Sequence, residues 1–305
     1  MRQQDFLTLK RAKMKLYKKR YKHFHRGKAV YIVLIITGLL LTGIILPGSI
    51  FSQQPTTFYR ISYYKVVPGK EEVLHSMTKN VDAQVQQARI KAGAILGWYM
   101  YKLLSPAGTS ADYDYMTVTI VKRYKHIFEP IYSFDSALNK TFSKKGAQFL
   151  KDYHSRLNES RKLVKEEIYA GIALADSSSK DGFQSKYIIS DFMQPKPEKF
   201  GEYMKAEVDT FRIIHRERIK MGGDISQWAC FSLMLPYDTK TGYSILTFNF
   251  YNDLDAITTS KYLEALKTTF PTVDLSRLFQ SVASMRDNPR ADLWQLVSFA
   301  SPATK

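Results

Sequence analysis

The sequence predicts an α+β protein in which a β-α-β-β-α-β order occurs twice, behind a basic and then apolar N-terminal region. The stretch RIKAGAILGWYMYKLLSP from Arg89 is repeated in outline by RIKMGGDISQWACFSLMLP from Arg218. Strand-like runs alternate with segments that have helical apolar spacing, in the same order both times. A polar, Gly/Ser-rich linker, ADSSSKDGFQS, separates the two copies. We therefore expect one domain over 53–178 and a second over 184–305.

The N-terminal region has the charge pattern of a membrane-inserted segment. Residues 1–28 hold eleven Lys/Arg against one acid, Asp5, so most of the formal net charge of +17 lies there. The run AVYIVLIITGLLLTGIIL at 29–46 follows without a charge. Basic residues before an apolar run indicate insertion topology rather than nucleic-acid binding. We expect 29–52 to be a signal peptide or a membrane anchor. The chain would then contact a membrane through 29–51, bind no nucleic acid, and place its domains in the periplasm or outside the cell.

A single cysteine, Cys230, excludes an internal disulfide. It follows Trp228 in an apolar strand-like run, where we expect it to be buried as a small apolar residue.

The elements of the first copy follow from local patterns. Aromatic and β-branched residues predict strands, apolar residues at helical spacing predict helices, and Gly93 ends the first helix. The expected strands are 58–67, 95–104, 113–121 and 166–175, and the expected helical segments are 70–92 and 124–163.

The second copy gives the same order, with Gly222 and Gly223 ending its first helix. The expected strands are 187–193, 225–235, 242–250 and 290–300, and the expected helical segments are 198–221 and 253–285.

Each copy therefore predicts the ferredoxin-like arrangement, with two helices on one face of a four-stranded antiparallel sheet. The other sheet face also carries large apolar residues and needs a partner. Two copies in one chain supply that partner. We expect sheet-to-sheet packing within one molecule, an intramolecular dimeric α/β barrel, in a monomer or a higher oligomer.

Several motifs carry a resemblance to known proteins. YxxVxPGK, Lys-x-Gly, a Trp, Pro-x-Gly-Thr and YDYxTV resemble a group of exported, uncharacterised bacterial proteins of the dimeric α/β-barrel type. The resemblance implies the fold over nearly all of 58–300 and no established activity. The copies differ, since the helical His215 corresponds to Gln86. The matching residues are Tyr63, Val66, Pro68, Gly69, Lys70, Lys91, Gly93, Trp98, Pro106, Gly108, Thr109, Tyr113, Asp114, Tyr115, Thr117, Val118, His215, Arg218, Lys220, Gly222, Trp228, Pro236 and Tyr243.

Strand alternation suggests a site between the two sheets. Residues i and i+2 share a face, so polar and aromatic residues on equivalent strands would line one space. A pocket with an aromatic wall and a few hydroxyl and amide groups suits a small molecule, whereas the alternative is a filled core. The candidate ligand-binding residues are Trp98, Tyr115, Thr117, Trp228, Ser232, Tyr243, Thr247 and Asn249, with Met100 and Cys230 on the same face.

Catalytic signals are weak. His215 near Glu217 is one candidate acid or base, and the alternative is a solvated helical face. No HExxH, Cys/His cluster, GxSxG, P-loop or dinucleotide motif is present, so we expect no metal site and no cofactor. Arg161 and Arg286 precede the last strands, where each would pair with nearby acids (Glu166 or Glu167, and Asp292) or bind an anion.

Two functions fit these observations. The first is an exported protein that holds a small, partly apolar molecule between its sheets. The alternative, implied by the barrel plan, is a cofactor-free monooxygenase-like or haem-related small-molecule enzyme. The sequence leaves open whether the protein is an enzyme.

Overall fold

The computed structural model describes residues 57–107, 112–176, 182–236 and 241–302. The expected basic region, 1–28, and the expected signal peptide or anchor, 29–52, lie outside these residues. None of the helices within the described ranges is both long and apolar enough to cross a bilayer.

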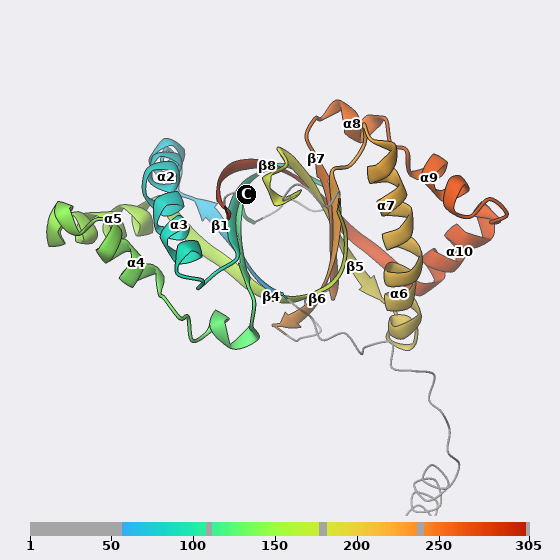
Figure 1. Ribbon diagram of the computed structural model, residues 1–305, viewed down its shortest axis with the longest axis horizontal. Coiled ribbons are helices and arrows are strands. Elements are labelled where there is room, and N and C mark those ends of the chain that lie inside the picture. Colours follow the sequence, from blue (N-terminus) through green and yellow to red (C-terminus); the bar gives the residue numbers. More distant parts are fainter. Residues whose placement is uncertain (1–56, 108–111, 177–181, 237–240, 303–305) are drawn as a thin grey trace, which may run out of the picture. The chain divides into compact units, whose positions relative to one another are not determined.

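Eight antiparallel strands close into a barrel in the order β1-β3-β2-β8-β5-β7-β6-β4 (Figure 1). Within each half of the chain the spatial order is that of a ferredoxin-like sheet, β4-β1-β3-β2 and β8-β5-β7-β6. The strands are β1(Phe58–Val66), β2(Gly97–Ala107), β3(Tyr115–Val121), β4(Arg161–Asp176), β5(Tyr187–Pro195), β6(Gln227–Leu235), β7(Ile245–Tyr251) and β8(Arg286–Ala300).

Two helical layers lie on opposite sides of the barrel (Figure 1). The first layer comprises α2(Glu71–Met77), α3(Ala83–Lys91), α4(Phe134–Thr141) and α5(Gly146–Ser160). The second comprises α6(Phe200–Ala206), α7(Arg212–Met221), α8(Asp255–Thr258), α9(Tyr262–Thr269) and α10(Leu275–Met285).

The two halves share their irregularities as well as their order. A π-helical turn interrupts the first helix of each half, at Thr78–Asp82 and at Glu207–Phe211. Gly93 and Gly222 end these helices with the same φ of 69°, a left-handed value that glycine adopts without strain. The sequence predicted both stops but neither π-turn.

Closure of the barrel depends on long edge strands. β2 pairs with β8 and β4 pairs with β6, which joins the halves by backbone hydrogen bonds as well as by side chains. β4 and β8 begin at Arg161 and Arg286, earlier than the expected 166 and 290, because their first residues pair with the ends of β1 and β5. The sequence pattern does not predict the register of these contacts.

The barrel interior is an aromatic core that residues of both halves build. Its members include Tyr63, Tyr99, Phe192, Phe248 and Trp294. Phe183, in the linker between the halves, joins this core and packs against Tyr59 and Tyr99. Separate apolar cores lie between the barrel and each helical layer. Cys230 is fully buried, as expected, in the core between the barrel and the second helical layer.

Candidate functional site

Most of the predicted site residues lie on the helix-covered side of the sheet, so their expected place between the sheets is wrong. Trp98 and Tyr115 pack with Leu74 in the core beneath the first helical layer. Trp228 packs with helical residues of the second layer. Thr117, Ser232, Thr247 and Asn249 stand opposite Met100, Ile245, Cys230 and Trp228 in the strand ladders, and so share their faces.

The physical reason for the error is that period-2 alternation groups residues on a face without saying which face it is. Both faces of this sheet are buried, one against helices and one in the barrel. Tyr243 is the exception among the eight, since it precedes β7 and packs against the barrel core.

The structure brings four of the nine candidates together at a cavity. His215, Trp228, Thr247 and Asn249 line a cavity of about 440 Å³ between the second sheet and its helices. Its wall also includes Phe279, which is 44% exposed, so the cavity reaches the protein surface. The other lining residues are Ile189, Asp191, Met193, Glu207, Phe211, Arg218, Tyr251, Ile257, Ser260, Tyr262, Val282, Arg286 and Asn288. This volume and mixed lining are those of a small-molecule site.

Glu207 is the most perturbed acid in the cavity wall. It lies in the π-turn, is only 3% exposed, and accepts a hydrogen bond from the hydroxyl of Tyr203. Burial raises the pKa of Glu207 to about 7, and Tyr203 and Arg286 oppose the rise. Glu207 can therefore gain or lose a proton near neutral pH.

Asp191 and Arg286 complete a polar group around the same cavity. Asn249 donates a hydrogen bond to Asp191 Oδ2 over 3.2 Å, and burial raises the pKa of Asp191. Arg286 lies 5.8 Å from the ring of Tyr203. Within the described residues, Arg286 Nε and Asn249 Oδ1 are buried and have no hydrogen-bond partner. A buried donor and a buried acceptor without partners leave two positions that a bound molecule would satisfy.

His215 is held in one protonation state. Its ring stacks on Trp228 with centroids 4.8 Å apart, and its Nδ1 lies 3.0 Å from Arg218 Nη1. Arginine can only donate, so Nδ1 accepts and the ring proton sits on Nε2. Burial first, and then Arg218, lowers the pKa of His215. His215 is thus a neutral hydrogen-bond donor rather than a base, and its expected partner Glu217 instead pairs with Lys220.

The same hydrogen bond decides against His215 as an iron ligand in the haem-related alternative. A metal-bound imidazole uses one nitrogen for the metal and normally donates from the other. Here Arg218, held by a buried ion pair with Asp224 at 2.6 Å, donates to Nδ1, so Nε2 carries the proton. The described residues also hold no group of three His, Cys, Asp or Glu side chains placed to bind a metal.

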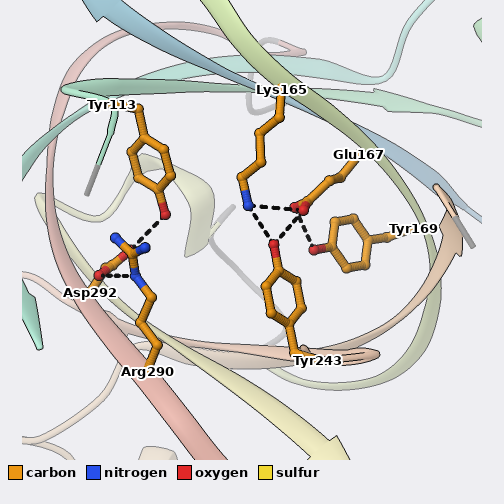
Figure 2. A network of polar contacts seen from close by, with 7 residues as sticks. All are labelled: Tyr113, Lys165, Glu167, Tyr169, Tyr243, Arg290 and Asp292. Carbon is orange, nitrogen blue, oxygen red and sulfur yellow. Dashed lines mark hydrogen bonds and ion pairs between the residues drawn. The ribbon is translucent and has the colours of Figure 1, made fainter. Parts of the chain in front are cut away.

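A second polar cluster lies inside the barrel (Figure 2). Lys165 donates to Glu167 Oε1 over 2.9 Å, Tyr169 donates to Oε2 over 2.8 Å, and Tyr243 also donates to Oε1. Nearby, Arg290 donates to Asp292 Oδ1 over 2.8 Å and Tyr113 donates to Oδ2 over 3.0 Å. Burial raises the pKa of Asp292, and Arg290 and Tyr113 oppose that rise.

These contacts form two matching triads of tyrosine, acid and base. In each triad the acid and base lie on the last strand of one half, and the tyrosine comes from the other half (Figure 2). Glu167 and Asp292 occupy matching places, opposite Ile61 on β1 and Ser190 on β5. Tyr243 and Tyr113 thus tie the halves together across the barrel.

The triads correct the expected ion pairs. Glu167 and Asp292 pair with the bases two residues upstream, Lys165 and Arg290. Arg161 and Arg286 instead lie over tyrosine rings, at 4.0 Å from Tyr64 and 5.8 Å from Tyr203. Strand alternation was the available signal, because i and i+2 share a face.

The first half has a cavity of about 410 Å³ beside Pro68, Lys102 and Tyr115, away from the place that matches the cavity of the second half. At the matching place a hollow of about 130 Å³ is lined by Arg60, Arg89 and Thr119, among others. The position of Glu207 in its π-turn is taken by Thr78, and Asp82 in the same turn accepts a hydrogen bond from Tyr153. The two halves therefore share the same arrangement of helices and strands and differ in the cavity between sheet and helices.

Asp191, Glu207 and Arg286 are among the cavity residues that the sequence did not predict as part of this site. Asp191 stands out as the one acid in the strand run YIISDFM, and Glu207 lies on a helical stripe with Tyr203, Phe211 and Ile214. A carboxylate within an apolar pattern was the usable signal for both. For Arg286 the sequence predicts only an ion pair or a bound anion.

Comparison with known proteins shows the fold. No protein-family model matches the sequence, and no curated protein gives a significant match. A solved structure from Fusobacterium nucleatum, provisionally described as a monooxygenase, is 13% identical, with 83% of this chain and 98% of that chain covered and a TM-score of 0.50. A second such protein, from Lactobacillus acidophilus, is 8% identical, covers 81% and 96%, and has a TM-score of 0.49.

A chlorite dismutase variant from Candidatus Nitrospira defluvii is 12% identical over 80% of this chain and 92% of its own, with a TM-score of 0.42. At such low identities the comparison speaks for architecture alone. The chain is an α+β protein with the barrel of the dimeric α/β-barrel proteins, closed here within one chain.

Proposed function

We propose that this protein binds a small, partly apolar molecule in the cavity of its second half, and that Glu207 exchanges a proton when the molecule binds. The observation that carries the proposal is that two residues lining the cavity, Arg286 and Asn249, each have a buried polar atom without a hydrogen-bond partner, Nε and Oδ1. The site expected between the sheets is thereby moved to the space between sheet and helices.

The two unpartnered atoms describe the ligand. Arg286 Nε needs an acceptor and Asn249 Oδ1 needs a donor. The cavity lining also includes the apolar and aromatic residues Trp228, Tyr262 and Ile257. A planar molecule with an anionic or carbonyl oxygen and a hydroxyl or N–H group fits this pattern.

Glu207 gives the site its proton. An anionic oxygen beside Arg286 would favour the protonated form of Glu207, whose pKa is already about 7. Binding an anion near neutral pH would therefore take up part of a proton.

Catalysis is the second candidate. An acid with a pKa near the working pH can act as a general base toward a bound phenol or enol. A monooxygenase-like activity without a cofactor starts from such a proton removal, and the structural neighbour from Fusobacterium nucleatum is described as a monooxygenase. The support from that neighbour is limited to the shared fold.

Three further points belong to the same proposal. The matching element order, π-turns and triads support a tandem duplication of one ferredoxin-like unit. Export is supported by the charge pattern of 1–46. A barrel that closes inside one chain supports a monomer.

The test uses 4-hydroxybenzoate as the probe, because it carries a carboxylate and a hydroxyl on an apolar ring. Calorimetry on residues 53–305 near neutral pH should show binding. Arg286→Gln should weaken it at least about tenfold, the loss of one charge-assisted contact. The matched control is Arg161→Gln, since Arg161 begins β4 as Arg286 begins β8 and also lies over a tyrosine.

Titrations in buffers with different ionisation enthalpies measure the proton. Wild type should take up a fraction of a proton, and Glu207→Gln should take up none while still binding. Equal weakening by both arginine substitutions, or binding that ignores Arg286, would contradict the cavity as the site. Binding without proton uptake would remove the role of Glu207.

A further inference from the structure

We infer that the segment from Lys122 to Ile131 is a docking surface for an anionic lipid bilayer. This segment connects β3 to α4 and includes a short 3-10 turn at Tyr124–Ile127. Its sequence, KRYKHIFEPI, places three exposed cations, Lys122, Arg123 and Lys125, before two large apolar side chains. Phe128 is 55% exposed and Ile131 is 61% exposed. Cations next to protruding apolar groups are the composition of a membrane-surface contact.

The exposed aromatic residue is held by local structure rather than by chance. The ring of Phe128 packs edge-on against Tyr124 at 5.4 Å, and Tyr124 packs against Phe58 at 5.6 Å. Backbone hydrogen bonds from Phe128 and Glu129 to the carbonyl of Lys125 close the turn. The segment therefore presents Phe128 outward from an ordered base.

The position of the segment in the fold agrees with a membrane partner. β1 and β3 pair Phe58 with Val121, so Lys122 emerges beside the point where the chain enters the barrel. The apolar run expected to be a signal peptide or anchor ends at Leu46, twelve positions before Phe58. Twelve extended residues span at most about 40 Å. An anchored chain would hold this end of the barrel close to the bilayer.

The second half carries the opposite charge at the matching place. β5 and β7 pair Tyr187 with Tyr251, and the chain then continues as Asn252, Asp253, Leu254 and Asp255. β1 and β5 point the same way, because four antiparallel steps separate them in the barrel. One barrel end therefore carries the basic and apolar segment on one side and the acids Asp253 and Asp255 on the other. An anionic surface would attract the first and repel the second, which fixes the orientation.

Flotation of residues 53–305 with lipid vesicles tests the inference. This part holds the whole closed barrel and both helical layers. We expect binding at low salt to phosphatidylcholine vesicles that contain about one third phosphatidylglycerol. Binding to these vesicles should be weaker at physiological salt than at low salt, and pure phosphatidylcholine vesicles should not be bound.

The variant Lys122→Glu/Arg123→Glu/Lys125→Glu should lower the partition coefficient at least 30-fold, since each cation near such a surface contributes roughly a fivefold effect. Phe128→Ser/Ile131→Ser should lower it about tenfold through lost apolar contact. The matched control is Lys140→Glu/Lys144→Glu/Lys151→Glu, which makes the same charge change on exposed residues of the α4–α5 region. It should change the partition less than about threefold.

Circular dichroism would confirm that each variant is folded. A wild-type domain that ignores anionic vesicles would overturn the inference. So would an equal loss in the control, because binding would then depend on net charge alone. If the triple variant does not fold, the Phe128 and Ile131 variant decides, and unchanged binding by it would overturn the apolar part of the surface.

Discussion

The barrel interior and the cavity of the second half both bury carboxylates, but only the interior provides each with a cation. Glu167 and Asp292 each have a base and a tyrosine within hydrogen-bond distance. Glu207 and Asp191 line the cavity, and no cation forms an ion pair with either among the described residues. A buried acid whose ion pair is formed serves the fold, whereas a buried acid without an ion pair, in the wall of a cavity, is available to a ligand.

Breaking an interior triad should produce the largest effect. Glu167→Ala leaves Lys165 without its counter-charge and two tyrosine hydroxyls without an acceptor. We expect a loss of about 3 to 4 kcal/mol in the free energy of unfolding, measured by urea denaturation. The neighbouring exposed-face control, Glu166→Ala, should cost less than about 1 kcal/mol. Similar losses of stability for Glu167→Ala and Glu166→Ala would mean that the buried triad does not stabilise the fold.

Glu207→Gln should raise the free energy of unfolding, whereas Glu167→Ala lowers it. The pKa of Glu207 is about 7 in the folded chain against 4.5 for a free glutamate. The unfolded chain therefore loses its proton first as pH rises, and the folded state becomes less stable between those two values. Glu207→Gln removes this penalty, so the variant should be more stable than wild type near pH 8 by up to about 3 kcal/mol.

Below pH 4.5 the difference between wild type and Glu207→Gln should nearly vanish, since the acid is then protonated in both states. Denaturation curves across this range give the profile. A difference that does not depend on pH would show that Glu207 is ionised at an ordinary pKa.

The two tyrosines of the triads should behave alike. Tyr113→Phe and Tyr243→Phe each remove one hydrogen bond to a buried carboxylate that keeps its base, and Tyr243→Phe also removes the one that Lys165 donates to the hydroxyl. We expect each to cost about 1 to 2 kcal/mol, by urea denaturation. A large cost for one and none for the other would break the equivalence of the two triads.

His215→Gln should have the smallest effect at neutral pH. The first half already uses this arrangement, where Arg89 donates to Gln86 Oε1 over 2.9 Å. A glutamine can accept from Arg218 in the same way, so the cost should be below about 1 kcal/mol at pH 7.5.

At lower pH the His215→Gln variant should become more stable relative to wild type. The pKa of His215 is lowered below the free value of 6.5, so unfolding takes up a proton and wild type loses stability as pH falls through 6.5. The glutamine variant lacks this loss. Thermal unfolding at pH 5 and pH 7.5 measures the difference, and parallel curves would mean that His215 is accessible to protons.

The fold was accessible from the sequence because similar patterns in the two halves indicated each element twice. The pattern from Arg89 and from Arg218 aligned the helices and strands, and the glycines at 93 and 222 ended the helices as predicted. The pairing of β2 with β8 and of β4 with β6 could not be predicted from the sequence, since strand pairing over long sequence distances leaves no local signal.

The candidate site could be predicted from the sequence only in part. Alternation grouped Trp228, Thr247 and Asn249 correctly, but the face that carries them was assigned to the barrel. Both faces are apolar, so hydrophobicity did not separate them. The sequence did not predict the triads because each joins residues that lie far apart in the sequence, such as Tyr113 and Asp292.

Two neighbouring isoleucines allow the most direct test of the contrast. Ile188 belongs to the barrel core and Ile189 lines the cavity, as Ile257 also does. Methyl NMR of isoleucine-labelled residues 53–305, titrated with 4-hydroxybenzoate, reads both places at once. We expect the signals of Ile189 and Ile257 to shift and that of Ile188 to stay. Shifts at Ile188 without shifts at Ile189, or no shift at saturating probe, would contradict the assignment of the cavity as the ligand site.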